Sequence, residues 1–599
     1  MTEVATQHSA EVRSENVDAF FMPAPWVCFR TWLSNDGDAK SMISNERSHQ
    51  IAVLEDESAR LWHQIEDGST RSSIVERALD LGVAEEVDEF LSMLCDLQLI
   101  IEKGSLSLAA AAQADPAPLP KQLEEGENTD IEHDTMQWVA DHGFLFGVHW
   151  EVTYRCNERC IHCYNPGAAH MPHEKPERET NELSTDEAID LLDHLREAGV
   201  FRLTLSGGEV TLRKDFWELV EAARKRGFSV NLYTNGLKLD DDACEKLAAL
   251  WPTTVSVSVY SADEKAHDDI TRVPSSYRRS IKVLETLRSK GIKTFLKSTQ
   301  MHHTLSGYKD VRNLSERLGA GAEIDMMMSA AADGASAPLA LAAKSPEELV
   351  LLAATAGSPL FVGSAATNWG KMDKDPNASV CGAGVGSLSL DPEGNVLVCS
   401  SMPLPAGNHR KHGFINIWRS SRHYRKTQAA QTSAGDLEDI VSPLSHWQGI
   451  VLKDFHECGT HRRCGWCAKC PGLAMLEHGD PLAPSTTNCR LATARMVAAD
   501  LLSQGYERAQ IAENLGVDEK FGELRPRVIP IIEEKQRGTG FNPTEVALKT
   551  LESRDPESPK LTAVLHNTSG KVILRRGTQS TADALHSFEE LKDRVLGSR

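Results

Sequence analysis

Between about residues 144 and 330, short apolar runs alternate with longer amphipathic segments. Five of these runs have the length and composition of strands: FGVHWEV, FRLTLSG, SVNLYTN, TVSVSVY and KTFLKST. The segments with apolar residues at helical spacing are 184–199, 215–226, 241–249 and 276–290. Such an alternation predicts a parallel sheet covered by helices, here long enough to form a partial barrel.

Residues 26–101 follow another pattern and predict a small α+β unit. Three strand-like runs, WVCFRTWL, AKSMISN and HQIAVLED, are separated by the turn-forming residues SNDGD and ERS. Helical segments follow at 57–67, 70–81 and 84–99. A meander followed by three helices is close to a winged-helix plan.

The other segments are less regular. Residues 105–135 are rich in Ala, Pro and acidic residues and predict a linker. Helical periodicity is weak in the following cysteine-rich region until LATARMVAADLL, and the tail combines a helix near 508–514 with the hairpin-like LTAVLHNTSGKVILRR. We expect an N-terminal domain at 1–104, a linker at 105–135, the partial barrel at 136–375 and the cysteine-rich domain at 376–500. A C-terminal extension of unknown role follows at 501–599.

Charge and composition restrict the classes of function. The 64 basic and 86 acidic residues give a net charge of −22, which argues against nucleic acid or an anionic membrane as a partner. The N-terminus lacks the apolar core of a secretory signal, and no run approaches the roughly 18 apolar residues of a membrane span. We therefore expect a cytoplasmic protein, whose thirteen cysteines are better interpreted as metal ligands than as disulfides.

Three cysteines, Cys156, Cys160 and Cys163, fall within eight positions directly after the first predicted barrel strand. The carboxyl ends of parallel barrel strands carry the reactive loops. Three thiolates on one short loop suit a cubane iron–sulfur cluster whose fourth iron is open. On spacing alone, redox thiols and a zinc site remain alternatives, although His162 has little freedom to complete a zinc tetrahedron.

The next predicted loop, LTLSGGEVTLRKDF, narrows these alternatives. Gly207 and Gly208 allow a ligand to approach the backbone closely, and Glu209 offers an acceptor for an ammonium group. Together with the cysteine loop, this motif resembles the radical S-adenosylmethionine (SAM) enzymes. The resemblance implies an α/β fold built on a partial (β/α)6 TIM-like barrel.

The same resemblance assigns roles to residues of this sequence. It implies a [4Fe-4S] cluster on the three cysteines that binds SAM, with Glu209 at the methionine amino group and His162 beside the adenine. In VSVSVYSADEKAHDDITRVPSSYRRS, Ser258 matches a ribose-contacting position, and Arg272 is a candidate partner of the SAM carboxylate. A buried strand serine and a surface ion pair are the competing interpretations of these two residues. Val210 replaces the proline of many members, which bears on the rigidity of the loop.

A second cysteine group lies between residues 381 and 489. Its pattern of a hairpin with a cysteine at either side, a tight cluster and a distant last cysteine resembles the SPASM extension of radical SAM enzymes. That extension typically holds two auxiliary clusters, whereas this region offers seven cysteines, so His456, His461, substrate or water could complete a site. Zinc alone remains an alternative. The seven candidate ligands are Cys381, Cys399, Cys458, Cys464, Cys467, Cys470 and Cys489.

The N-terminal unit resembles the PqqD-like domains that recognise leader sequences of ribosomally made peptides. Its HQIAVLE run is the expected edge strand, to which a peptide could add by main-chain hydrogen bonds. The predicted groove lies between helix 84–99 and the strand residues Ile51, Ala52, Val53 and Leu54. A DNA-binding winged helix is the structural rival, but AEEVDEFLSMLCDLQ is acidic.

Together these resemblances imply a radical SAM/SPASM enzyme that modifies a precursor peptide, bound through its leader. A flavodoxin or ferredoxin would supply electrons, and a thioether or carbon–carbon cross-link is the expected product. Formylglycine formation, synthesis of a peptide-derived redox cofactor and a non-catalytic iron–sulfur sensor remain alternatives. No catalytic acid or base is assigned, although Lys297 and Asp325 on later strands are expected to point inward.

Overall fold

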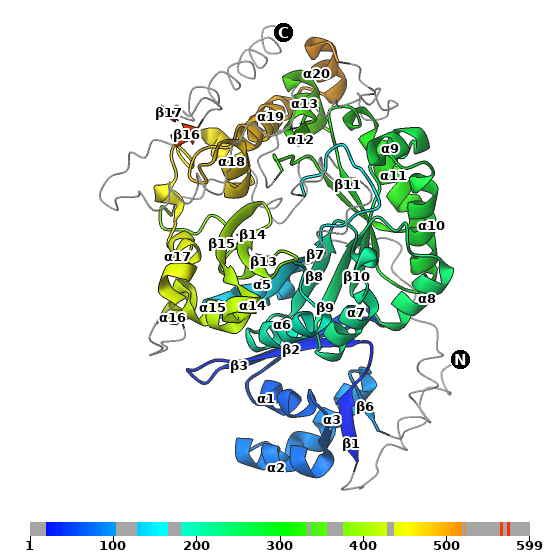
Figure 1. Ribbon diagram of the computed structural model, residues 1–599, viewed down its shortest axis with the longest axis vertical. Coiled ribbons are helices and arrows are strands. Elements are labelled where there is room, and N and C mark those ends of the chain that lie inside the picture. The colour runs from blue at the N-terminus through cyan, green and yellow to red at the C-terminus, as the bar shows by residue number, and fades with distance from the viewer. Residues whose placement is uncertain are drawn as a thin grey trace.

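The computed structural model describes residues 19–103, 129–165, 181–331, 337–343, 345–355, 370, 375–427, 437–517, 520, 564–566 and 572–574. The chain forms a central barrel-like sheet, a cysteine-rich region beside it and a small N-terminal unit below it (Figure 1). None of the described helices combines the length and the apolar character that a membrane crossing requires. Most of the predicted linker, residues 104–128, lies outside the described residues.

The six strands β7 to β12 lie side by side in chain order and pair in parallel. This confirms the predicted α/β fold with a partial barrel. The strands are β7 (Gly147–Thr153), β8 (Arg202–Gly207), β9 (Ser229–Thr234), β10 (Thr254–Ser258), β11 (Thr294–Thr299) and β12 (Gly321–Asp325). The helices of this region are α6 (Thr185–Glu197), α7 (Phe216–Lys225), α8 (Asp241–Ala249), α9 (Glu264–Thr271), α10 (Ser276–Ser289), α11 (Tyr308–Leu318), α12 (Ala337–Ala340) and α13 (Pro346–Ala353).

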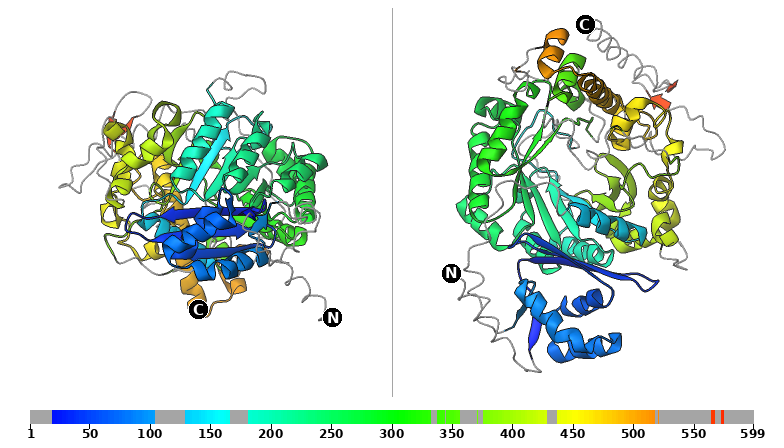
Figure 2. Two further views of the ribbon diagram at one scale, coloured as in Figure 1. Left: turned by 90° about the horizontal axis from the view of Figure 1, so that it is seen from below. Right: turned by 180° about the vertical axis from the view of Figure 1, so that it is seen from behind.

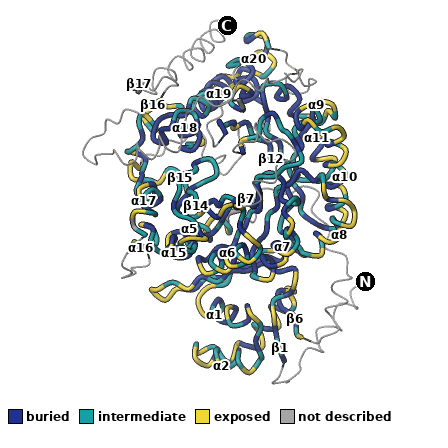
Figure 3. Tube along the Cα trace, viewed as in Figure 1, coloured by how far each residue is buried: buried dark blue, intermediate teal, exposed yellow. Residues whose placement is uncertain are grey.

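Alternation along each strand separates two faces of the sheet. On β7, Val148, Trp150 and Val152 join the main hydrophobic core, which also contains the buried leucines of α6 and α7. His149 and Glu151 alternate with them and therefore face the concave side. Burial is deepest along the strands, while the outer faces of the helices are exposed (Figure 3). Polar side chains of β7 thus line the interior of the barrel.

The cysteine-rich region continues the same sheet. Strand β13 (Ser387–Leu390) pairs in parallel with β7, and β14 (Asn395–Cys399) and β15 (Met402–Asn408) extend the sheet to nine strands. Helical periodicity is weak in most of this region, yet several short helices surround the strands. They are α14 (His409–His412), α15 (Phe414–Ser420), α16 (Arg422–Thr427), α17 (Glu438–Trp447), α18 (Pro471–His478), α19 (Thr486–Ser503) and α20 (Arg508–Leu515). The helix expected at LATARMVAADLL and the one expected near 508–514 are present as the last two helices of this series.

The N-terminal unit contains the predicted meander and helical triplet. Its sheet has the order β2-β3-β4, so β4 lies at an edge, as expected. A second sheet, β5-β1-β6, was not predicted. The elements are β1 (Phe20–Pro23), β2 (Val27–Leu33), β3 (Ala39–Asn45), β4 (Gln50–Glu55), α1 (Asp56–Ile65), β5 (Ser69–Thr70), α2 (Arg71–Leu81), α3 (Val87–Asp96) and β6 (Ile100–Glu102).

This unit docks on the amino-terminal ends of the barrel strands (Figure 2). Arg30 Nε donates to Val200 O at 2.8 Å, and Trp32 Nε1 donates to Gly199 O at 2.7 Å, just before β8 begins. Phe29 N donates to Gly227 O at 2.8 Å, just before β9. The carboxyl ends of the strands, where the first cysteine loop lies, are therefore at the opposite end of the barrel.

Two further segments bear on the expected organisation: one helix begins within the predicted linker, and a pair of strands lies in the tail. Helix α5 (Thr129–Asp141) begins inside the segment predicted as linker and packs Met136, Trp138 and Val139 against the base of the barrel. In the tail, β16 (Val564–His566) and β17 (Val572–Leu574) pair antiparallel, as the predicted hairpin requires.

Candidate active site

The first cysteine loop follows β7 and is held by backbone hydrogen bonds to the end of α9. Arg159 N donates to Thr271 O at 2.9 Å, and Ile161 N donates to Ile270 O at 3.1 Å. Helix α9, which the strand and helix pattern did not predict, thus fixes the loop on either side of its second cysteine, Cys160. The loop is a rigid platform at the carboxyl end of the barrel.

The three thiols of this loop are close enough to influence one another. Burial, Glu158 and the two other cysteines raise the pKa of Cys160 well above its ordinary value. Burial also raises the pKa of Cys156 to about 12 and that of Cys163 to about 11. Thiols bind a metal centre as thiolates, and three of them on one short loop can be deprotonated together when a cationic centre displaces their protons. The residues therefore fit an iron–sulfur cluster.

The two glycines of the GGE loop allow this loop to lie directly on the cysteine loop. Gly207 has a φ of 131°, and a Cβ there would lie 2.1 Å from Thr153 O. A Cβ on Gly208 would lie 2.3 Å from Arg155 O. The backbones are joined by Gly208 N to Thr153 O at 2.7 Å and by Glu209 N to Arg155 O at 2.8 Å. Close approach of two backbones is the physical reason for two glycines here.

Glu209 does not extend from this loop as an open acceptor. Its side chain is fully buried, and its carboxylate accepts hydrogen bonds from Thr211 N, from the hydroxyls of Thr211 and Thr234, and from Asn235 N. Burial raises the pKa of Glu209 despite these donors. The carboxylate therefore ties the GGE loop to the end of β9. The expected contact between Glu209 and the SAM amino group stays a prediction. The backbone of Gly207 and Gly208 is more exposed than the Glu209 side chain and is better placed for such a contact.

Asn235 connects the GGE loop with the cysteine loop and was not singled out from the sequence. Its amide nitrogen Nδ2 donates to Asn157 Oδ1 at 2.7 Å and lies 3.9 Å from Cys156 Sγ, while its backbone nitrogen serves Glu209. An Asn-Gly pair directly after the third barrel strand, in LYTNG, was the available signal. Its position makes Asn235 part of the scaffold around the cluster site.

His162 and Ser258 meet through Tyr260. The rings of His162 and Tyr260 are 4.3 Å apart in an edge-to-face arrangement, and the Tyr260 hydroxyl is hydrogen-bonded to Ser258. Burial lowers the pKa of His162 to about 4, and its Nδ1 has no hydrogen-bond partner among the described residues. A neutral ring with a spare polar atom beside the cysteines suits contact with a heterocycle. The roles assigned to His162 and Ser258 remain predictions that this geometry accommodates.

Arg272 lies next to the cysteine loop but is exposed. It ends α9 in the left-handed conformation, with a φ of 59°, and directly follows Thr271, which accepts the hydrogen bond from Arg159. Its predicted partnership with a carboxylate is neither supported nor contradicted by a contact.

Polar side chains from alternate strands meet on the concave face below this loop. The rings of His149 on β7 and Tyr233 on β9 are 5.9 Å apart, and Lys297 Nζ on β11 lies 4.4 Å from the Tyr233 ring centre. Lys297 Nζ also donates to Glu323 Oε2 at 2.8 Å. Because β7, β9 and β11 are not neighbours, these contacts run across the interior. Lys297 therefore points inward, as expected, toward other polar side chains of the barrel interior.

Glu151, also on β7, is a buried acid with an unusual environment. It is 5% exposed, and the hydroxyl of Tyr164, next to Cys163, donates to its Oε1 at 3.2 Å. Burial raises the pKa of Glu151 to about 7, although the hydrogen bonds from Tyr154 and Tyr164 oppose the shift. The sequence did not single out Glu151, because a lone acidic residue near the end of an apolar strand is usually exposed to solvent.

Replacing Glu151 with Gln tests this environment. Between the unfolded pKa near 4.5 and the folded pKa near 7, the native carboxyl is protonated while the unfolded one is ionised, so native stability falls as the pH rises through this window. The variant lacks that loss. The unfolding free energy of the variant should exceed that of the unchanged protein by almost nothing at about pH 5. The difference should grow to about 1–3 kcal/mol at about pH 8. Thermal unfolding across this range measures it, and a pH-independent difference would contradict the assignment.

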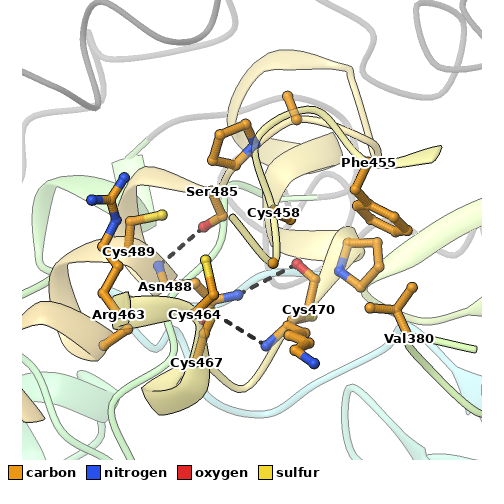
Figure 4. A pocket seen from close by; sticks show the side chains of 16 residues that line it. Val380, Phe455, Cys458, Arg463, Cys464, Cys467, Cys470, Ser485, Asn488 and Cys489 are labelled. Atoms are coloured by element: carbon orange, nitrogen blue, oxygen red, sulfur yellow. Dashed lines mark hydrogen bonds between the residues drawn. The ribbon is translucent and has the colours of Figure 1, made fainter. Parts of the chain in front are cut away.

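The seven cysteines of the second group separate into sets of four and three. Five of them line one pocket (Figure 4): Cys458, Cys464, Cys467 and Cys489, which form the set of four, and Cys470, which belongs to the set of three. Burial and the three other members raise the pKa of Cys458, in the order Cys489, Cys467, Cys464. Helix α19, which carries Cys489, is joined to the other three by Arg495, whose NH1 donates to Trp466 O at 2.9 Å. Cys458 and the three cysteines that influence it provide the four ligands that a closed four-iron cluster requires.

The remaining set is Cys381, Cys399 and Cys470. Burial, Cys399 and Cys381 raise the pKa of Cys470, and burial and Cys399 raise that of Cys381. Gly472 explains the approach of these segments, because a Cβ there would lie 2.4 Å from Ser401 O. His456, one proposed extra ligand, instead lies 3.5 Å from a carboxylate oxygen of Asp480.

Two protein-family models match the chain, one over the first cysteine loop and one over most of the second cysteine group. The model described as the radical SAM superfamily matches residues 150–312, and the SPASM model, described as an iron–sulfur cluster-binding domain, matches residues 381–471. The chain contains a radical SAM domain and a SPASM domain. Their cofactors are [4Fe-4S] clusters and SAM, for which the cysteine sets described above provide suitable ligands.

Individual relatives differ in the reactions that their names state. The chain is 28% identical over 344 residues to the AdoMet-dependent heme synthase of Nitratidesulfovibrio vulgaris, covering 53% of this chain and 86% of the relative. It is 27% identical over 296 residues to the mycofactocin maturase MftC of Mycobacterium tuberculosis, covering 47% and 73%. Among solved structures, SuiB of Streptococcus suis bound to the precursor peptide SuiA has a TM-score of 0.46 at 13% identity, covering 78% of this chain and 99% of that one.

Proposed function

We propose that this chain is a radical SAM enzyme that modifies a ribosomally made precursor peptide, and that its N-terminal unit holds the leader of that peptide. The product we favour is a thioether or carbon–carbon cross-link. The observation that carries the proposal is the edge strand β4, which pairs only with β3 among the described strands. Its backbone offers a peptide a ladder of main-chain hydrogen bonds.

The side chains of β4 suit this role. Ile51, Ala52, Val53 and Leu54 are all half-buried. Ala52 and Leu54 pack with the core below α1 and α3, whereas Ile51 and Val53 pack toward α5 on the other face. An added strand would meet partly apolar surface on both faces. A maturase among the relatives is consistent with a peptide substrate.

The roles of the barrel residues follow from their positions. Cys156, Cys160 and Cys163 would hold the cluster, and the Gly207–Gly208 backbone would approach bound SAM. When bound there, the reduced cluster and SAM supply a carbon radical able to take a hydrogen atom from an unactivated C–H bond. The half-buried His149, Tyr233 and Lys297 would contact the substrate, and the deep barrel excludes water from it.

A porphyrin-modifying reaction is the second candidate, because the heme synthase is matched over 86% of its length. An enzyme with that activity could use the same two cysteine-rich regions. The reaction does not, however, account for an N-terminal unit with an open edge strand.

The test combines the protein with a peptide encoded beside its gene. Co-expression in deuterated water, followed by intact-mass measurement of the peptide, should show loss of hydrogen without added atoms, and fragmentation should locate the new bond. Incorporation of one deuterium at carbon with otherwise unchanged composition would indicate epimerisation. No change in any neighbouring peptide, together with turnover of an iron porphyrin, would contradict the proposal.

A further inference from the structure

One stretch of this acidic chain contains no acidic residue. Residues 394–435 have no Asp or Glu, although the chain has 86 of them in 599 residues. The same stretch contains six Lys and Arg residues: Arg410, Lys411, Arg419, Arg422, Arg425 and Lys426. They lie on the consecutive helices α14, α15 and α16 at the outer edge of the cysteine-rich region (Figure 1).

Two of the six charges are neutralised by the neighbouring helix α6. Arg410 NH2 donates to Glu187 Oε2 at 3.0 Å, and Arg419 NH2 donates to Glu197 Oε1 at 2.7 Å. In contrast, Lys411, Arg422 and Lys426 are exposed, and none of them forms an ion pair with a carboxylate of the described residues. A positive surface therefore remains after the internal pairs are formed.

The geometry of α16 concentrates this charge. Arg422 and Lys426 are four residues apart and therefore project from the same side of this short helix. Like charges at this spacing repel one another. Such an arrangement is unfavourable for the isolated protein and becomes favourable when an anionic surface covers it.

The same helix is connected to one of the cysteine sets. His423 N on α16 donates to Gln448 Oε1 at 2.8 Å, and Gln448 Nε2 donates to Gly384 O at 2.7 Å. Trp447 Nε1 donates to Ala383 O at 2.8 Å. The loop held by these bonds begins at Cys381. The positive surface and the three-thiol set thus share one short, hydrogen-bonded scaffold.

We propose that Lys411, Arg422 and Lys426 form the docking surface for an acidic one-electron carrier protein of the flavodoxin or ferredoxin class. The Cys381, Cys399 and Cys470 set is the entry point for its electron. One electron leaves the reduced carrier and reduces an iron–sulfur cluster of this chain by one electron, and no atom is transferred. The proposal rests on the proposed function, since only a reductive enzyme needs such a carrier.

Charge complementarity favours this occupant. An acidic carrier and this positive surface attract each other, and association between opposite charges is accelerated at low salt. The rest of the chain, with its net charge of −22, would repel an acidic partner and direct it to this surface. An acidic leader peptide is the competing partner, which the experiment separates.

The test uses the anaerobically reconstituted holoprotein and the variant Lys411→Glu/Arg422→Glu/Lys426→Glu. Its affinity for a flavodoxin, measured by calorimetry at about 50 mM salt, should fall at least tenfold, and the affinity of the unchanged protein should fall similarly at about 300 mM salt. SAM cleavage driven by reduced flavodoxin should fall to the same extent. Cleavage driven by dithionite, a small reductant that needs no docking surface, should be unchanged.

A matched variant controls for the change in net charge. Lys225→Glu/Lys265→Glu/Lys282→Glu reverses three exposed lysines on α7, α9 and α10 and should leave flavodoxin affinity within about twofold. Equal losses in both variants, or no loss in the first, would overturn the docking surface. So would a loss confined to peptide binding. If the unchanged protein makes no 5′-deoxyadenosine with dithionite, the proposed function fails, whereas flavodoxin binding still reports on the surface.

Discussion

Replacing Cys156, Cys160 and Cys163 together with alanine is expected to abolish the formation of 5′-deoxyadenosine from SAM. The three thiols share one loop and influence each other's pKa, so removal of all three eliminates a single cluster site. The iron content should fall by about four per chain, while the iron held by the second cysteine group remains. Chromatography of the products after anaerobic reduction and iron analysis measure the two effects.

Cys95→Ala is the matched control. Cys95 lies on α3 of the N-terminal unit, packed against the core there and far along the chain from the cluster ligands. Its removal should change neither iron content nor SAM cleavage. Residual cleavage in the triple variant would mean that SAM binds a cluster of the second group, and the assignment of the first loop would be wrong.

Gly208→Ala should nearly eliminate SAM binding while leaving all clusters in place. The new Cβ would lie 2.3 Å from Arg155 O and 2.7 Å from Tyr154 O, and backbone atoms cannot move aside as a flexible side chain can. The GGE loop must then separate from the cysteine loop and lose the bond from Glu209 N to Arg155 O. We expect a destabilisation of about 2–4 kcal/mol and a SAM affinity at least tenfold lower.

Gly147→Ala gives the comparison for this substitution. Gly147 begins β7, the strand that leads into the cysteine loop, but a Cβ there would meet its nearest atom, Arg202 O, at 3.8 Å. That is an ordinary contact, so SAM affinity and thermal stability should change little. Equal effects of the two substitutions would show that the close approach of the loops at Gly208 has no special importance.

The parts of this molecule that the sequence predicted are those encoded by local patterns. The strand and helix rhythm predicted the barrel strands, because apolar residues alternate where a strand faces helices on one side. The cysteine loop and the GGE loop were located because their side chains and glycines lie within a few positions of each other. The meander of the N-terminal unit followed from turn residues between short strands.

Features created by contacts between distant segments were not predictable in this way. The division of seven cysteines into four and three depends on Gly472 approaching Ser401 and on α19 returning Cys489 to the pocket. The burial of Glu209 depends on Asn235 at the end of another strand. Cys28 lies beside Glu46 and Thr253 between two units, at Sγ–oxygen distances of 3.2 and 3.5 Å. No spacing within the chain records such neighbours.

The docking of the N-terminal unit at the amino-terminal ends of the barrel strands determines how far a held peptide must travel. β7 has seven residues, which corresponds to about 23 Å, and the cysteine loop begins beyond its far end. A peptide anchored on β4 would have to traverse this length before any of its atoms met the chemistry. Positions adjoining the anchored stretch would therefore escape modification. Such an enzyme would select the residue that it modifies by its distance from the leader. Peptides with fewer than roughly seven extended residues between the leader and that residue would not be modified.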